Sequence, residues 1–310
     1  MAEILCIALN PTIDISCTAE RVQPTHKIRT SSQVRSPGGG GVNVARVISR
    51  LGGEAELLYC SGGATGKLLD DSLQDLPFDL LPVQIDEPTR IAFMVAEQQS
   101  GFEYRFVPDG PSVNSEDLAS IRSAVAGFSG RYIVASGSLP PGAPVDTYAV
   151  MAREACRKGQ RLVLDTSGEA LKHTLDHAAV YLAKPSLREL ESYIGHSLNE
   201  AGARAAAMTL VERGAATYVA VSMGAQGAFL ASADGVLRMS APRVVVRSAV
   251  GAGDSFVAAM VTSFAAGHDV KAAFLRGMAA GAAAVMTEGT ELCRPEDIDE
   301  IYQHLKPAPQ

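Results

Sequence analysis

Short apolar runs alternate with longer segments of helical hydrophobic spacing along most of the 310-residue chain. The short runs predict strands at residues 4–9, 55–60, 132–135, 161–164, 180–183 and 218–222. The helical segments between them stop at glycines, as in residues 42–51, 145–158 and 200–213. This alternation is typical of parallel strands joined by crossover helices. We therefore expect an α/β fold with a doubly wound, mostly parallel sheet flanked by helices.

Two segments depart from this pattern. Residues 17–35 alternate polar and apolar side chains, and residues 89–107 predict a hairpin that turns at Ser100-Gly101. Together they could form a small sheet beside the core. We expect an α/β core that carries the ATP and catalytic site and comprises residues 1–16, 36–88 and 109–310. The remaining segments, 17–35 and 89–108, would form a β-sheet lid that also makes a dimer contact.

Composition and charge narrow the class of protein. With 47% hydrophobic and 20% charged residues the chain predicts a globular protein, and its net charge of −7 argues against nucleic acid or an anionic membrane as a partner. The N-terminal apolar run follows Glu3 and is no signal peptide, and no run reaches the ~18 apolar residues of a membrane span. Five widely spaced cysteines predict reduced thiols in a cytoplasmic protein.

Residues 250–255, Val-Gly-Ala-Gly-Asp-Ser, open an alanine-rich helix that we expect to run to about residue 266. Small residues before a helix leave backbone N–H groups free to bind an anion, and the helix dipole strengthens such a site. Asp254 would lie in the first turn, where a carboxylate can accept the proton of an attacking hydroxyl during phosphoryl transfer. From these residues alone, an aspartate that only satisfies the helix end is an equal alternative. Neither a Walker A loop nor a dinucleotide glycine pattern fits the chain.

A second glycine segment, residues 38–41, is followed by Asn43 at the start of another predicted helix. Consecutive glycines let the backbone approach a ligand closely, and the asparagine amide can donate to and accept from hydroxyl groups. Asp14 follows the first strand at its carboxyl end, where open α/β sheets bind ligands. The alternatives are a flexible connector and an unpaired polar loop residue.

Basic residues are concentrated in one stretch. Six of them and no acidic residue occur between Arg21 and Arg50, and the expected lid adds Arg90 and Arg105. A basic edge facing a glycine loop predicts a substrate that already carries a phosphate. A solubilising surface is the alternative, although such surfaces usually mix the two signs.

These segments resemble the ribokinase-like PfkB sugar kinases. Residues 37–46 and 250–255 match the two signature segments of that family, and residues 136–142, 184–185 and 222–227 follow the family order between them. Within the family the chain is most similar to the bacterial minor-type 6-phosphofructokinases. Fructose-1-phosphate and tagatose-6-phosphate kinases usually carry a lysine where this chain has Gly40.

The resemblance implies ATP-dependent phosphorylation of fructose 6-phosphate at its 1-hydroxyl. It makes Asp254 the base, with an anion hole at Gly251, Ala252 and Gly253. Sugar hydroxyls would be held by Asp14, Gly38, Gly39, Asn43 and Ser138, and the existing phosphate by Lys27, Arg29, Arg90 and Arg105. The ATP side would be lined by Lys184, Ser186, Ser222, Gly224, Gly227 and Ala282.

The resemblance also implies metals and an assembly. Mg²⁺ would be held through water by Glu189, although Ser186 replaces the asparagine of the family's N-x-x-E element. K⁺ would lie behind the anion hole, at Ser248, Val250, Ala284, Thr287 and Gly289, and the lid would join two copies in a homodimer. The alternatives are a tagatose-6-phosphate or fructose-1-phosphate kinase, and a catalytically silent sugar-phosphate sensor.

Overall fold

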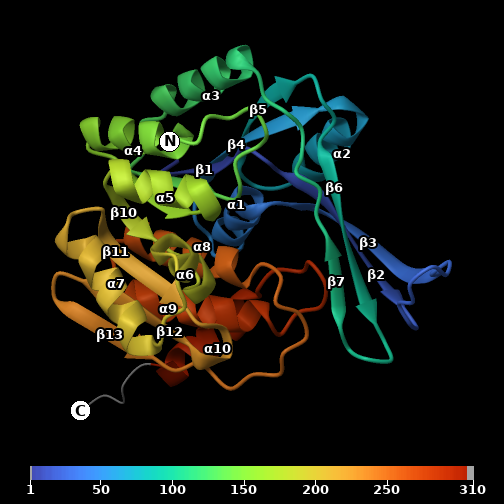
Figure 1. The fold of residues 1–310 in the computed structure, drawn as a ribbon. Coiled ribbons are helices and arrows are strands. Elements are labelled where there is room, and N and C mark those ends of the chain that lie inside the picture. Colours follow the sequence, from blue (N-terminus) through green and yellow to red (C-terminus); the bar gives the residue numbers. More distant parts are fainter. Residues whose placement is uncertain (1, 306–310) are drawn as a thin grey trace.

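The structure is a computed structural model that describes residues 2–305. Its main sheet has nine strands in the order β13-β12-β11-β10-β9-β8-β1-β4-β5, and the seven strands from β11 to β5 are parallel (Figure 1). The strands of this sheet are β1 (Ile4–Ala8), β4 (Ala55–Gly62), β5 (Asp79–Ile85), β8 (Tyr132–Ser136), β9 (Arg161–Asp165), β10 (Val180–Ala183), β11 (Ala216–Ser222), β12 (Ala228–Ser232) and β13 (Gly235–Met239).

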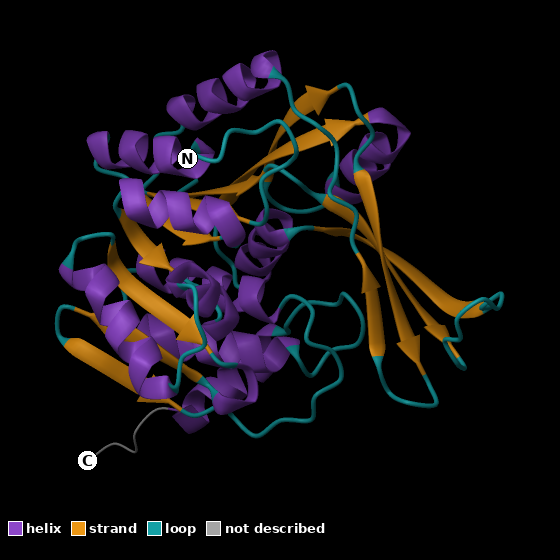
Figure 2. Ribbon diagram, viewed as in Figure 1, coloured by secondary structure: helices purple, strands orange, loops and turns teal. Residues whose placement is uncertain are grey.

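Helices cover both faces of this sheet (Figure 2). Because side chains alternate along a strand, Ile4 and Cys6 of β1 enter one apolar core while Leu5 and Ile7 enter the other. The first core packs against α1, α8 and α9, and the second against α4, α5 and α7. The helices are α1 (Gly40–Arg50), α2 (Gly63–Leu73), α3 (Ser115–Gly127), α4 (Thr147–Arg157), α5 (Gly168–His177), α6 (Leu187–Ile194), α7 (Glu200–Glu212), α8 (Ala252–Ala265), α9 (Val270–Ala284) and α10 (Pro295–Leu305). The predicted fold class is confirmed.

A second sheet of four strands stands off one side of the core, in the order β3-β2-β6-β7 (Figure 1). The predicted hairpin is present, with the turn closed by a 2.9 Å hydrogen bond from Gly101 N to Glu97 O. The sheet begins earlier than residue 17, because the polar and apolar alternation of β2 already starts at Thr12. Its strands are β2 (Thr12–Ala19), β3 (Thr30–Gly38), β6 (Arg90–Glu97) and β7 (Glu103–Phe106).

Three strands of the main sheet lack a strong sequence signal. β5 includes Pro82, and β12 and β13 form an antiparallel hairpin at the other end of the sheet. β5 and β13 are edge strands, which tolerate proline and exposed side chains because one of their sides makes no ladder, whereas β12 is buried between β11 and β13. Among residues 2–305, no helix is long and apolar enough to cross a membrane.

Candidate active site

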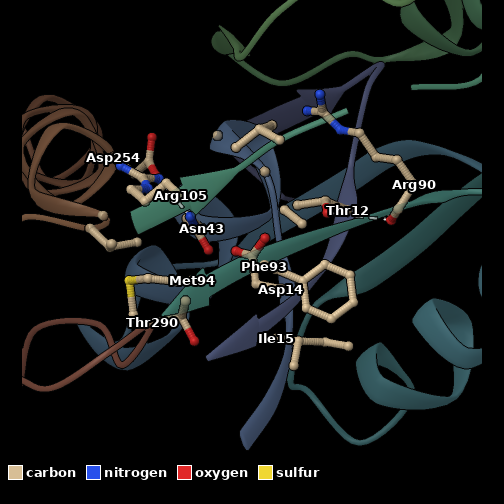
Figure 3. A pocket seen from close by; sticks show the side chains of 16 residues that line it. Thr12, Asp14, Ile15, Asn43, Arg90, Phe93, Met94, Arg105, Asp254 and Thr290 are labelled. Carbon is tan, nitrogen blue, oxygen red and sulfur yellow. Dashed lines mark hydrogen bonds between the residues drawn. The ribbon is translucent and has the colours of Figure 1, made fainter. Parts of the chain in front are cut away.

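A cavity of about 160 Å³ lies where the small sheet meets the core (Figure 3). Its walls include Asp14 and Arg105 from the small sheet, and Asn43 and Asp254 from the first turns of α1 and α8. The starts of α1 and α8 lie together, and strands β2 and β7 of the small sheet bring Asp14 and Arg105 to the same place. The cavity is therefore shared between the two sheets.

Asp254 is fixed in the first turn of α8. Gly251 caps this helix in the left-handed region at φ 72°, and no side chain caps it, so its first N–H groups remain available to an anion. Asn43 Nδ2 donates a 2.8 Å hydrogen bond to Asp254 Oδ2. Burial and the negative charge of Asp165 raise the pKa of Asp254 to about 7, although the Asn43 hydrogen bond and Lys184 oppose the rise. A carboxylate with this pKa suits a general base near neutral pH.

Lys184 brings a positive charge to the same helix end. A side chain at Gly253 would place its Cβ 3.3 Å from Lys184 Nζ, a tight contact, so the glycine lets the ammonium lie close to the start of α8. Lys184 Nζ also lies 3.0 Å from Asp165 Oδ1. Burial alone would lower the pKa of Lys184, but the charges of Asp165, Glu189 and Asp254 raise it above its ordinary value. The ammonium therefore stays protonated and can face a phosphate.

Asp165 is a residue that the sequence interpretation missed. It ends β9, one position beyond the predicted end of the strand, and it binds both Lys184 and Ser136 Oγ, the latter at 3.3 Å. A carboxylate at the carboxyl end of a parallel strand is a signal that could have identified it.

Asp14 follows β1 in the chain and lies within strand β2, so the alternative of a loop residue is wrong. A Cβ at Gly38 would lie 2.0 Å from Asp14 Oδ2, so the glycine makes room for the carboxylate. Burial raises the pKa of Asp14 to about 6, and Arg105, Arg90 and Arg46 limit the rise. An acceptor carboxylate thus projects into the cavity opposite Asp254 (Figure 3).

The four-glycine segment is only partly a loop. Gly40 and Gly41 belong to the first turn of α1, whereas Gly39 caps the helix at φ 97° and lines the cavity. A Cβ at Gly41 would lie 2.3 Å from Ile7 O, so this glycine lets α1 pack directly on β1. The interpretation as a ligand-facing segment therefore applies to Gly39 and Gly40, which line the cavity, and not to Gly41.

The predicted basic edge does not form one surface. Arg46 and Arg50 lie on α1 of the core, while Lys27 and Arg29 are exposed in the β2–β3 connection and do not line the cavity. This separation arises because the stretch from Arg21 to Arg50 crosses from the small sheet into the core.

Two arginines of the small sheet do line the cavity. Arg90 donates to three backbone carbonyls, those of Asn10 at 2.7 Å, Pro11 at 3.4 Å and Pro108 at 2.8 Å. Arg105 has no ion-pair partner among residues 2–305. Arg105 is therefore the cavity arginine whose donors are most available to an anionic ligand.

Two further residues near the cavity lacked a sequence signal. Asn10 Nδ2 donates to Ser138 Oγ at 3.1 Å, and neither residue lines the cavity. Among residues 2–305 the buried Oδ1 of Asn10 has no hydrogen-bond partner. Thr290 lines the cavity, and its hydroxyl lies 2.5 Å from Ser36 Oγ of β3. Thr290 thereby links the loop after α9 to the small sheet.

Five of the six residues predicted for ATP, all except Ala282, lie at or after the carboxyl ends of β10 and β11. Ser186 caps α6 in a capping box, in which Ser186 N donates to Glu189 Oε2 at 2.7 Å and Glu189 N donates to Ser186 Oγ at 3.3 Å. Ser186 also bridges to Ser222. Gly224 begins a short 3-10 turn, Gly227 ends it at φ 101°, and Ala282 lies on α9. Ser186 thus caps the helix and keeps the Glu189 carboxylate in place.

Four of the residues predicted for a monovalent cation lie in two adjoining segments beside the start of α8. Ser248 N donates to Val285 O at 3.4 Å, and Val250 N donates to Ser248 Oγ at 3.3 Å. Thr287 Oγ1 lies 2.8 Å from Ala284 O. Gly289 instead packs against the small sheet, because a Cβ there would lie 3.1 Å from Ser16 Oγ.

Comparison with known proteins identifies the family and proteins of similar sequence and structure. The model of the pfkB family of carbohydrate kinases matches residues 1–297. The ATP-dependent 6-phosphofructokinase isozyme 2 of Mycobacterium tuberculosis is 39% identical over 307 residues, which cover 97% of this chain and 89% of the relative. Phosphofructokinase-2 from Escherichia coli in complex with potassium superposes with a TM-score of 0.93 at 36% identity, and its complex with fructose-6-phosphate with a TM-score of 0.92 at 34% identity. Both superpositions cover 98% of this chain and 99% of the other.

Proposed function

Because the chain belongs to the pfkB family of carbohydrate kinases, it is a sugar kinase, and we propose that it transfers the γ-phosphoryl group of ATP to the 1-hydroxyl of fructose 6-phosphate. The products are fructose 1,6-bisphosphate and ADP. The observation that carries this proposal is the half-buried Asp254, held by Asn43 at the start of a helix that lies beside Lys184. The names of the relatives support the choice of substrate.

Asp254, the backbone N–H groups at the start of α8 and Lys184 have different roles in the proposed reaction. Asp254 accepts the proton of the 1-hydroxyl, whose oxygen attacks the γ-phosphorus as the bond to the ADP oxygen breaks. The N–H groups of Gly251, Ala252 and Gly253, together with the helix dipole, stabilise the charge of the moving phosphoryl group. Lys184, kept protonated by its carboxylate neighbours, faces the same phosphates.

The carboxylates around Lys184 fit a divalent cation. Glu189 uses Oε2 in the capping box, which orients its second oxygen, and Asp165 lies on the other side of the lysine. Mg²⁺ favours one or two carboxylates supplemented by water and substrate phosphates. When bound, Mg²⁺ would neutralise charge on the ATP phosphates, with Glu189 holding it through water. The segments at Ser248, Val250, Ala284 and Thr287 would hold K⁺ through backbone carbonyls.

The small-sheet side of the cavity suits a sugar phosphate. Asp14, Asn43 and Gly39 would bind its hydroxyls, while Arg105 and the remaining donors of Arg90 would bind the existing phosphate. Gly40 favours fructose 6-phosphate over the alternative ketohexose phosphates. A Cβ there would lie 2.3 Å from Ser136 Oγ, which leaves no room for the lysine of the other kinases.

The small sheet serves both as a lid and as a contact between two copies of the chain. Phe93 and Phe106 are paired across β6 and β7, and their side chains are 44% and 57% exposed. Adjacent exposed aromatic side chains are a liability in a monomer and favour a protein interface. A homodimer formed through this sheet would cover them.

An ADP-release assay with a panel of sugar phosphates tests the proposed function. We expect fructose 6-phosphate to give the highest kcat/KM, and ³¹P NMR to identify the product as fructose 1,6-bisphosphate. A preference for tagatose 6-phosphate or fructose 1-phosphate would change the assigned substrate but leave the assigned reaction, phosphoryl transfer from ATP, unchanged. Binding of sugar phosphates without ADP release would instead establish a sensor.

A further inference from the structure

Arg46 lies one helical turn after Asn43 on α1, and its guanidinium contacts the Asn43 side chain. Nη1 of Arg46 donates to Pro37 O at 2.9 Å and lies 3.4 Å from Asn43 Oδ1. The side chain is half-buried, and it has no ion-pair partner in the described part of the chain. Arg46 does not line the cavity. Its donors are therefore directed at the α1–β3 junction and not at a bound phosphate.

These contacts determine which end of the Asn43 amide faces Asp254. Oδ1 faces the Arg46 guanidinium, which is donor-only, and Nδ2 faces the Asp254 carboxylate, which accepts hydrogen bonds when it is ionised. Rotation of the amide by 180° would place two donors together at Arg46 and two acceptors together at Asp254. Both hydrogen bonds would be lost, and each of them involves a charged group, whose hydrogen bonds are stronger than those between neutral groups. The guanidinium thus selects one amide orientation.

We propose that Arg46 is a positioning residue, which fixes the Asn43 amide so that Nδ2 holds the Asp254 carboxylate ready to accept the proton of the sugar hydroxyl. This inference rests on the proposed function only in assigning the base role to Asp254, since the chain of contacts from Arg46 to Asp254 lies in the protein itself. Arg46 touches neither substrate nor the reacting atoms.

A purely structural role is the competing explanation, because the bond to Pro37 O also ties α1 to the last residues of β3. A structural role would lower stability or loosen the small sheet whatever residue occupies position 43. A positioning role requires the asparagine. A double-mutant cycle between positions 43 and 46 separates the two.

The cycle uses Arg46→Met, which keeps most of the apolar stem but removes every donor, in wild-type and Asn43→Ala backgrounds. With asparagine present we expect kcat for fructose 6-phosphate to fall about 10- to 50-fold and the KM for ATP to change less than about 3-fold. In the Asn43→Ala background the same substitution should change kcat less than about 2-fold. An equal loss in both backgrounds overturns the proposal. Arg50→Met is the matched control, because Arg50 is on the same helix and donates instead to Leu292 O at 2.7 Å.

A second measurement does not depend on activity. The chain has four asparagines, so ¹⁵N-asparagine labelling gives four pairs of side-chain amide signals. The pair from Asn43 is identified by its loss in Asn43→Ala. We expect Arg46→Met to shift that pair and Arg50→Met to leave it in place. An unmoved Asn43 pair in Arg46→Met contradicts the proposal, and it does so even if fructose 6-phosphate proves not to be the substrate, an outcome that only the ADP-release assay decides.

Discussion

Lys184 and Asp165 form an ion pair at the centre of the site, with 3.0 Å between Nζ and Oδ1 and with side chains only 6% and 13% exposed. Asp165 ends β9 and Lys184 directly follows the neighbouring parallel strand β10, so the sheet itself sets their separation. Removal of one partner from such a pair leaves the other charge buried and uncompensated.

We therefore expect Asp165→Asn to lower the free energy of unfolding by about 3 kcal/mol and to raise the KM for ATP more than that for the sugar phosphate. Chemical denaturation and steady-state kinetics measure the two effects. Asp71→Asn is the control, because it breaks an exposed i,i+4 pair with Lys67, and such pairs contribute less than about 0.5 kcal/mol. Equal stability changes in the two variants would show that burial of the Lys184–Asp165 pair is energetically unimportant.

Asp254→Asn should leave substrate binding intact while it lowers turnover by about 10²- to 10⁴-fold, the usual contribution of a general base. The amide is nearly isosteric but cannot accept the hydroxyl proton. Turnover from the ADP-release assay and binding of fructose 6-phosphate by calorimetry provide the comparison. Unchanged turnover would remove Asp254 from the mechanism.

The pH dependence of kcat/KM should show an acidic limb with a midpoint near pH 7, because the pKa of Asp254 is raised to about 7 and only the ionised carboxylate is a base. The same shift affects stability. Since the folded-state pKa lies above the unfolded value of 3.8, the folded protein binds the proton more tightly, and stability falls as the pH rises from about 4 to about 7. A midpoint near pH 4 would contradict the burial argument.

Arg105→Ala should raise the KM for fructose 6-phosphate about 10- to 100-fold and leave the KM for ATP unchanged. Arg105 lines the cavity beside Asp14, whereas Lys184, which we propose faces the nucleotide phosphates, does not line it. Charge-assisted hydrogen bonds to a phosphate are stronger than hydrogen bonds between neutral groups. Arg122→Ala, an exposed position on α3, is the matched control. Similar changes in both KM values would mean that Arg105 does not distinguish the two substrates.

Gly38→Ala should abolish activity, because the new Cβ would lie 2.0 Å from Asp14 Oδ2 and displace that carboxylate. Gly127→Ala makes the same chemical change in α3, where nothing lies within 4 Å of the Cβ and φ is not positive. That control should keep full activity and gain up to about 1 kcal/mol of stability from helix propensity. Normal kinetics in Gly38→Ala would show that Asp14 tolerates displacement.

The sequence determined the order of strands and helices in the core, since the central parallel strands are buried on both faces and their apolar runs are unambiguous. It also located Asp254 and its glycines, because a helix N-terminus that binds an anion depends on consecutive residues. The hairpin at residues 89–107 was predicted for the same reason, because its turn is formed by consecutive residues. Edge strands such as β5 escaped prediction because exposure on one side relaxes the requirement for apolar residues.

Relations between distant residues were decided by the tertiary structure alone. Asp165 joins Lys184, Thr290 joins Ser36, and Asn43 joins Asp254 across 211 positions because packed strands and helices end at one edge of the sheet. The same packing separated residues that are neighbours in the chain, so the basic stretch that begins on the small sheet continues onto α1 of the core, at Arg46 and Arg50. Local composition encodes the elements and the chemistry that each can carry, whereas pKa values, amide orientations and charge partners depend on which elements pack together.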